Sequence, residues 1–464
     1  MTRQRAGARL LRGISANLFS LVIRIGSQLT LIPILFAFWP ADRVGVWMML
    51  ATVPSFIGLI AGGYAAAAAN AALSASDNAR KRQGRQAFAA SMFAATIGTA
   101  ALSLVVLIAI EAVPQRILGD GLTPTLPQFR TITALLVAYS FASAWQSALE
   151  VPLRLAGRYP EHIAIGSGSA GLDVAAVAVA VAMGGGFVEL AAAMAGVRIC
   201  AFIATYLFAR RVSPAVMRWR NGGDTVEYAK GLLKPALAFI ILTLIPVLNL
   251  QSYALIVGLA FGPVVLAGFV ATRTLARLFD IVVGAVFTIQ YFEHAHLDGD
   301  TQAKQRRLLA TMTVVMLVAA IAFVMFLVLL GGPVQRIWTM GETRFDPAIA
   351  AIVVTGALLR GLAASPAAAL AARNDHGAHT SAYLGGSIIA LAAAIALAIS
   401  GAPPLAVIAM IVAAELGHTV AAFARAFAKL NYRARDFLTD LVSTQRLADV
   451  TAVLRHVTRR EART

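Results

Sequence analysis

The sequence predicts an all-α polytopic membrane protein with twelve transmembrane helices, and three observations support this prediction. Of the 464 residues, 59% are hydrophobic and 13% are charged, whereas soluble domains carry roughly 25% charged residues. Apolar runs of about 20 residues recur from end to end, and each is long enough to cross the core of a bilayer. Lysine and arginine gather in alternate segments between these runs, as they do in membrane proteins of fixed orientation.

The apolar runs follow one another closely. No segment between them exceeds about 40 residues, which is too short for a separate soluble domain. The predicted spans are 14–38, 45–73, 88–110, 131–151, 163–183, 187–209, 236–258, 264–290, 311–330, 347–371, 379–399 and 405–428.

The basic residues predict the orientation of these spans. With the N-terminus in the cytoplasm, the inner segments hold 28 lysines and arginines and the outer loops hold 5. Positive charge collects in cytoplasmic loops, so both termini are expected inside. This bias also accounts for the net charge of +17 without nucleic acid as a partner. The first run lacks a small-residue cleavage pattern and therefore predicts a membrane helix, not a cleaved signal peptide.

The chain divides in the middle. Residues 210–235 form the longest internal cytoplasmic segment and separate an N-terminal lobe of six spans (1–209) from a C-terminal one (236–428). Many secondary transporters are built from such paired bundles, with the cargo site near the midplane. Residues 429–464 form a basic cytoplasmic tail, in which apolar residues at helical spacing around 447–457 favour either an amphipathic helix on anionic membrane lipids or a solvated tail.

Charged side chains inside the spans are the main functional signal. A charge at the bilayer centre is unfavourable by about 2.5–3.5 kcal/mol, so such residues face a protein interior or a water-filled cavity. Five of them are arginines, and clustered positive charge in a membrane indicates an anionic cargo. They are Arg24, Arg198, Arg273, Arg277 and Arg360.

Several of these charges have an alternative interpretation as structural ion pairs. Asp173 and Arg198 lie at equal depth on consecutive antiparallel spans. Arg273, Arg277 and Asp280 share one predicted helical face, because they are spaced by four and three residues. Glu415 and His418 share a face of the last span. We expect Asp173, Arg198, Asp280, Glu415 and His418 to form ion pairs or to couple transport to an ion.

Other function classes lack their motifs. The sequence has no GxxxxGK[ST] phosphate loop, HExxH, CxxC or GxSxG. Its one cysteine, Cys200, excludes an intramolecular disulfide and a cysteine-based metal cluster. The outer loops are too short to hold the acceptor of a membrane glycosyltransferase or ligase. We therefore expect a protein that is not an enzyme, with no catalytic residue, metal or cofactor.

Several short motifs resemble the polysaccharide-exporter branch of the multidrug/oligosaccharidyl-lipid/polysaccharide (MOP) exporter superfamily, which includes the O-antigen flippases. The resemblance extends over the whole chain in the number and spacing of spans. The motifs are Asn17, Gln28 and Pro33 in the first span, Gly45-Val46-Trp47, Asn70 before Arg80-Lys81-Arg82, the stretch from Arg154 to Tyr159, and the stretch from Ala271 to Leu275.

The resemblance implies two six-helix lobes around a central cationic cavity. Members of this branch move undecaprenyl-pyrophosphate-linked oligosaccharides, such as O-antigen or exopolysaccharide repeat units, to the outer leaflet of the bacterial inner membrane by alternating access. Cationic residues in the cavity hold the head group. By position Arg24 and Arg273 match this pattern, and Gln28, Arg277 and Arg360 are further candidates for substrate binding. Other polysaccharide-assembly proteins of the membrane are implied as partners.

Two alternatives remain open. A cation-coupled drug exporter of the same superfamily typically needs a buried acid in its first span, where this chain has Arg24 and no acid. A membrane glycosyltransferase or ligase is disfavoured by the short outer loops. The lipid II flippases of the superfamily have two further spans, which are absent here, and this favours the O-antigen or exopolysaccharide branch.

Overall fold

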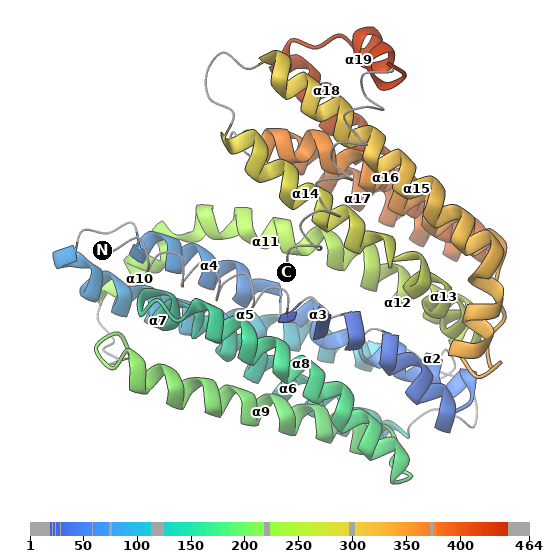
Figure 1. The fold of residues 1–464 in the computed structure, drawn as a ribbon. Coiled ribbons are helices and arrows are strands. Elements are labelled where there is room, and N and C mark those ends of the chain that lie inside the picture. The colour runs from blue at the N-terminus through green and yellow to red at the C-terminus, as the bar shows by residue number, and fades with distance from the viewer. Residues whose placement is uncertain are drawn as a thin grey trace, which may run out of the picture. The chain divides into compact units, whose positions relative to one another are not determined.

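The computed structural model confirms the all-α polytopic membrane fold. It describes residues 19–20, 22–23, 25–27, 29–57, 59–73, 77–112, 125–217, 223–296, 302–371, 375 and 377–443. Within these ranges the chain is helical and contains no strand (Figure 1). The predicted binding residues Arg24 and Gln28 and the predicted tail helix at 447–457 lie outside the described residues.

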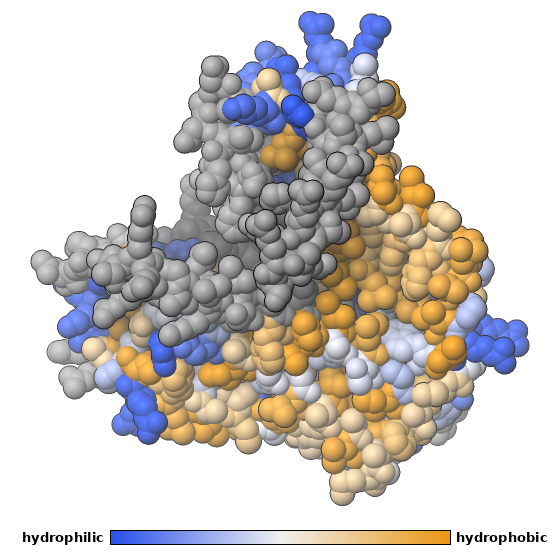
Figure 2. Space-filling view, in the orientation of Figure 1, coloured by the Kyte–Doolittle hydropathy of each residue, from blue (hydrophilic) through white to orange (hydrophobic). Residues whose placement is uncertain are grey.

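Most predicted spans are present as long helical segments, of which Ala41–Leu73 comprises three consecutive helices and Pro127–Leu155 comprises most of one helix and all of a second. Within the described ranges, nine helices are long and apolar enough to cross a membrane, and each coincides with a predicted run. They are Ala41–Leu73, Ala79–Ile108, Pro127–Leu155, Tyr159–Ala182, Phe187–Val212, Gln302–Trp338, Pro347–Ala371, Gly377–Ile399 and Pro404–Leu430. Large apolar side chains such as Val328 and Ile389 are exposed on them, as expected for a surface in contact with lipid. Figure 2 shows apolar residues over much of the visible described surface.

The chain forms two compact units. Unit 1 comprises residues 1–267 and 338–342, and unit 2 comprises residues 268–337 and 343–464. The division into lobes at 210–235 remains a prediction of the sequence.

Unit 1 is a bundle of helices with many small residues. Its described elements are α2 (Ala41–Leu50), α3 (Val53–Ile57), α4 (Leu59–Leu73), α5 (Asp77–Ala112), α6 (Leu126–Ala148), α7 (Glu150–Leu155), α8 (Tyr159–Ala182), α9 (Phe187–Val212), α10 (Gly223–Gly231), α11 (Leu233–Val247), a π-helical turn (Leu248–Ser252) and α12 (Tyr253–Phe261). Helix α4 packs against α5 and α11, and α9 packs against α6 and α8. A Cβ atom at Gly63 of α4 would lie 2.7 Å from the backbone nitrogen of Ile240, so glycine permits the close approach of α4 and α11.

Unit 2 contains the second set of long helices. Helix α13 (Pro263–Ala276) begins in unit 1 and continues into unit 2, where α14 (Phe279–His296), α15 (Gln302–Trp338), α16 (Pro347–Ala371), α17 (Gly377–Ile399), α18 (Pro404–Leu430) and α19 (Ala434–Leu441) follow. Helix α16 packs against α14 and α18, and α17 packs against α18. The short helix α19 lies at the beginning of the predicted tail and buries Phe437 against Phe423, Phe427 and Tyr432.

Several predicted spans are interrupted, and two of these interruptions lie in the spans at 236–258 and 264–290. The span at 236–258 contains the π-helical turn at Leu248–Ser252, which accommodates one extra residue per turn. The span at 264–290 was expected as one helix, but it is divided at Arg277 and Leu278 into α13 and α14. There the backbone N–H groups of Leu278 and Asp280 donate to carbonyls three residues earlier, so the chain tightens into a turn. Arg277 therefore lies on this turn, and its backbone N–H still donates to the carbonyl of Arg273 one helical turn earlier.

Candidate functional site

Unit 2 brings together five residues predicted from the sequence and one further residue that contacts them. We use the term polar cluster for Arg277, Asp280, Arg360, Tyr383, Glu415 and His418, which come from the α13–α14 turn and from α14, α16, α17 and α18. These helices are neighbours, because α16 packs on both α14 and α18 and α17 packs on α18. The sequence predicted five of these six positions.

Asp280 connects two arginines. Its Oδ2 accepts a hydrogen bond from Arg277 Nε at 3.1 Å and lies 3.5 Å from Nη1 of Arg360. Arg277 and Asp280 are three residues apart, which is the spacing of neighbours along a helical turn. The side chains of Arg277 and Arg360 are each 27% exposed.

Glu415 is the buried acid of the cluster. Its side chain is 0% exposed, and both carboxylate oxygens lie 2.9 Å from the hydroxyl of Tyr383, which donates to them. Arg360 Nε lies 3.5 Å from Oε1 of the same carboxylate. Arg360 is thus placed between the two acids, Asp280 and Glu415. A buried carboxylate requires such partners, because an unpaired charge away from water is strongly unfavourable.

Two aromatic residues of α17 complete this region, and the sequence reasoning missed both. The ring of Tyr383 stacks on His418 with centroids 3.9 Å apart and an interplanar angle of 12°. The ring of His379 also stacks on His418, with centroids 5.9 Å apart and an interplanar angle of 20°. His418 Nδ1 lies 3.9 Å from Glu415. The spacing of four between His379 and Tyr383 was the available signal, since it places two polar rings on one face of an apolar helix.

Arg273 lies apart from these contacts although it belongs to the same unit. Its side chain is buried, and the residue is 8% exposed. The guanidinium carbon lies 5.2 Å from the ring centroid of Phe269, one turn earlier on α13. This is a cation–π contact, in which the ring faces the charge. Together Arg273, Arg277 and Arg360 supply three guanidinium groups in unit 2, against the carboxylates of Asp280 and Glu415.

Unit 1 holds the other predicted pair. Arg198 of α9 contacts Asp173 of α8 through Nε at 3.0 Å and Nη2 at 2.5 Å. The hydroxyl of Tyr139 donates to the same carboxylate oxygen at 3.2 Å, and Arg198 Nη1 donates to the hydroxyl of Ser169 at 3.1 Å. Opposite charges in direct contact form a neutral network that ties α6, α8 and α9 together. This geometry favours the structural alternative for Asp173 and Arg198.

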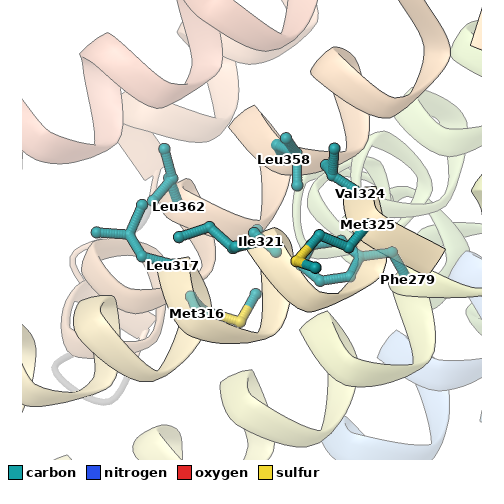
Figure 3. Close-up of a pocket in the computed structure, with 10 residues that line it drawn as sticks. Phe279, Met316, Leu317, Ile321, Val324, Met325, Leu358 and Leu362 are labelled. Carbon is teal, nitrogen blue, oxygen red and sulfur yellow. The ribbon is translucent and has the colours of Figure 1, made fainter. Parts of the chain in front are cut away.

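Unit 2 also contains an apolar groove. Its volume is about 270 Å³, and it lies between α14, α15 and α16. Figure 3 shows Phe279, Met316, Leu317, Ile321, Met325 and Leu358 pointing toward it. Every residue of its lining is apolar, so the groove offers no hydrogen-bonding group to a ligand. Among the described residues we find no group of three or more His, Cys, Asp or Glu side chains suited to hold a metal ion.

The sequence matches no family model and no curated protein. Solved structures match nearly the whole chain. An inward-facing multidrug resistance MATE family transporter of the MOP superfamily has a TM-score of 0.70 at 14% identity, over 89% of this chain and 98% of that one. The lipid II flippase MurJ, in an inward closed conformation, has a TM-score of 0.64 at 12% identity, over 96% of this chain and 92% of that one.

The chain has the fold of MOP-superfamily transporters. A MOP superfamily transporter from Pyrococcus furiosus, described as having reverse polarity of its binding pocket, also matches, with a TM-score of 0.56 at 14% identity over 91% of this chain and 95% of that one. The MOP fold is thus shared with proteins named both as multidrug transporters and as a lipid flippase. The fold by itself does not assign a cargo, so the cargo must be argued from this chain's own side chains.

Proposed function

We propose that this protein is a flippase that moves a polyprenyl-pyrophosphate-linked oligosaccharide, an O-antigen or exopolysaccharide repeat unit, from the inner to the outer leaflet of a bacterial cytoplasmic membrane. The observation that carries the proposal is the presence of three guanidinium groups within the predicted spans of unit 2. Arg273, Arg277 and Arg360 lie on membrane helices or on the turn within a span, and Arg277 and Arg360 converge on the carboxylate of Asp280.

An anionic head group is a suitable ligand for these guanidinium groups. Guanidinium groups bind phosphate oxygens through paired, charge-assisted hydrogen bonds, which a lysine ammonium does not match. Arg277 and Arg360 currently share Asp280 as a partner, at 3.1 and 3.5 Å. A pyrophosphate would accept hydrogen bonds from both groups while the buried Glu415 continues to hold Arg360 in place.

The membrane potential supplies a driving force for this cargo. Moving one charge across the membrane is worth about 2.3 kcal/mol per 100 mV, so two phosphate charges gain roughly 4–5 kcal/mol when they move out of a negative interior. This is sufficient to bias transport without ATP, and it agrees with the absence of a phosphate loop from the sequence. The bias of basic residues predicts cytoplasmic termini, which places the loading side of the transporter inside.

The comparisons support two candidate cargoes. The match to a protein named lipid II flippase favours the lipid-linked glycan. The match to a multidrug resistance transporter supports the second candidate, export of a small molecule. The guanidinium groups favour the first, because a cationic drug would be repelled by them.

The test is translocation of a fluorescent undecaprenyl-pyrophosphoryl oligosaccharide in proteoliposomes. We expect wild-type protein to move the lipid, faster with a negative interior, and Arg277→Ala to lower the rate about tenfold, since a charge-assisted hydrogen bond is worth about 1.5–3 kcal/mol. Arg336→Ala is the matched control, because Arg336 is an exposed arginine of the same unit outside the polar cluster. Arg24→Ala and Arg273→Ala extend the series to the other predicted binding residues.

Two results would overturn the proposal. Wild-type protein that leaves the lipid in place but exports a cationic dye would identify a drug exporter with structural arginines. Equal rates for wild type and for the correctly folded Arg277→Ala, Arg273→Ala and Arg24→Ala variants would show that the guanidinium groups do not contact the cargo.

A further inference from the structure

We propose that unit 1 contains a binding pocket for a neutral sugar residue of the cargo, separate from the arginines of unit 2. This inference rests on the proposed function and specifies which part of the cargo unit 1 recognises. The pocket has a volume of about 530 Å³ and is lined by residues of the first span, α7 and α8. Ligand pockets for small molecules typically measure about 300–1,000 Å³, so one or a few sugar rings fit it by size.

The lining of this pocket is rich in groups that bind hydroxyls. Four hydroxyl side chains, one carboxylate and one imidazole face it, whereas the groove of Figure 3 is apolar throughout. The polar lining residues are Ser20, Ser27, Glu150, Tyr159, His162 and Ser167. Hydroxyls both donate and accept hydrogen bonds, and a carboxylate accepts several. A polyhydroxylated ring is the ligand class that uses all of these groups at once.

One group of the pocket has a clear need for a partner. Nδ1 of His162 is buried and forms no hydrogen bond within the described structure. Buried polar atoms are rarely left unsatisfied, and exceptions frequently indicate a missing ligand or water. A sugar hydroxyl reaches this nitrogen once the imidazole turns toward the pocket, where the hydroxyl either donates to or accepts from it.

The charged groups at the described lining residues favour a neutral ligand. Glu150 Oε1 accepts a hydrogen bond from Arg154 Nη1 at 2.9 Å, and the guanidinium of Arg154 lies 5.1 Å from the ring centroid of Tyr159. Arg154 therefore neutralises the carboxylate of Glu150, and its guanidinium contacts both Glu150 and the ring of Tyr159. A cationic ligand would have to displace Arg154 from Glu150, whereas an anionic ligand would meet the carboxylate. A neutral sugar encounters neither penalty.

Two glycines of α8 allow a controlled test of the pocket by substitution with a larger side chain. Gly166 lines it, and a Cβ at this position would meet no atom within 4 Å. Gly168 also has open space around a Cβ, but it lies two residues further along the helix and does not line the pocket. Leucine favours helices more than glycine does, so the same substitution at either site is compatible with α8. Gly166→Leu and Gly168→Leu are therefore a matched pair.

The pocket lies where a cargo would load under the predicted orientation. Tyr159, His162 and Gly166 belong to the first turns of α8, which follow the predicted cytoplasmic segment after the fourth span. Ser20 belongs to the first half of the first span and Ser27 to its middle, and this span also starts in the cytoplasm by prediction. Both elements enter the membrane from the side on which lipid-linked repeat units are presented in the proposed function.

The experiment measures binding of three lipids to the full-length protein in nanodiscs. The probes are undecaprenyl pyrophosphate, the same lipid bearing one N-acetylglucosamine, and the same lipid bearing one galactose. In wild-type protein we expect at least one sugar to lower the Kd about tenfold, which corresponds to one or two net hydrogen bonds. Gly166→Leu removes this sugar-dependent gain and leaves the Kd for undecaprenyl pyrophosphate unchanged, and Gly168→Leu behaves as wild type. Ser167→Ala gives a smaller loss of the gain.

The outcomes separate this inference from the proposed function. If no lipid binds to wild-type protein, the proposed function fails together with the pocket. If undecaprenyl pyrophosphate binds and neither sugar changes its Kd, the flippase proposal survives and the sugar pocket is refuted. A sugar-dependent gain that persists in Gly166→Leu, or that Gly168→Leu also removes, refutes the assignment to this pocket.

Discussion

Replacement of Arg360 by methionine gives the strongest test of the polar cluster. Arg360 lies 3.5 Å from Glu415 and 3.5 Å from Asp280, and the Glu415 side chain is 0% exposed. Removing one partner of a buried ion pair typically destabilises a protein by about 3–5 kcal/mol, because the other charge is left without compensation. Arg360 is 27% exposed and its contacts are long. We therefore expect a loss of about 2–3 kcal/mol, below the usual range for fully buried pairs.

The assay is reversible unfolding in mixed micelles with increasing denaturing detergent, followed by tryptophan fluorescence. Glu415→Leu and the double variant Arg360→Met/Glu415→Leu complete a cycle that isolates the interaction. We expect each single change to destabilise the protein and the double change to restore part of the loss, since an apolar pair leaves no buried charge. Strict additivity of the two single effects, or a loss below about 0.5 kcal/mol for Arg360→Met, would refute the reasoning.

Three further predictions concern single contacts. Tyr383→Phe removes the donor to buried Glu415, with a loss of about 1.5–3 kcal/mol in the same unfolding assay; an unchanged midpoint would contradict this contact. Gly63→Ala forces apart α4 and Ile240 and is expected to lower stability by about 1–3 kcal/mol, whereas Gly62→Ala, with open space around its Cβ, does not. A hydrogen bond from Lys429, assisted by Arg425, lowers the pKa of Asp375 below its ordinary 3.8. A lowered pKa of Asp375 stabilises the fold above its unfolded value of about 3.8, and this stabilisation is lost as the pH falls through the folded pKa. The melting temperatures of wild type and Asp375→Asn should therefore differ near pH 7 and converge in acid. A difference that is constant with pH would contradict the pairing of Asp375.

Much of the architecture was accessible from the sequence. The bilayer requires about 20 apolar residues per span and excludes unpaired backbone groups, so hydropathy locates the helices. The nine long helices of the described residues coincide with predicted runs for this reason. Asp173 and Arg198 form the ion pair that their equal predicted depth suggested. They can do so because a short connection keeps α8 and α9 adjacent and antiparallel.

The remaining features depend on tertiary contacts. Lipid is as apolar as leucine, so an apolar helix face does not reveal whether a neighbour or a lipid covers it. The short connection keeps α17 and α18 adjacent, but the sequence did not indicate that the face bearing Tyr383 meets Glu415. Nor did it reveal the turn at Arg277 and Leu278, since no proline or glycine occurs at this point.

The sequence by itself thus determined the helical membrane class, the positions of most spans and the presence of buried charge, because the energetics of the bilayer act on each segment separately. Only the tertiary structure decided which charges of α14, α16 and α18 are partners. Asp280 is shared by Arg277 and Arg360, and Glu415 is enclosed by Arg360 and Tyr383, because α14, α16, α17 and α18 pack side by side. Pairing of this kind depends on distances between segments far apart in the chain, and no local pattern encodes them.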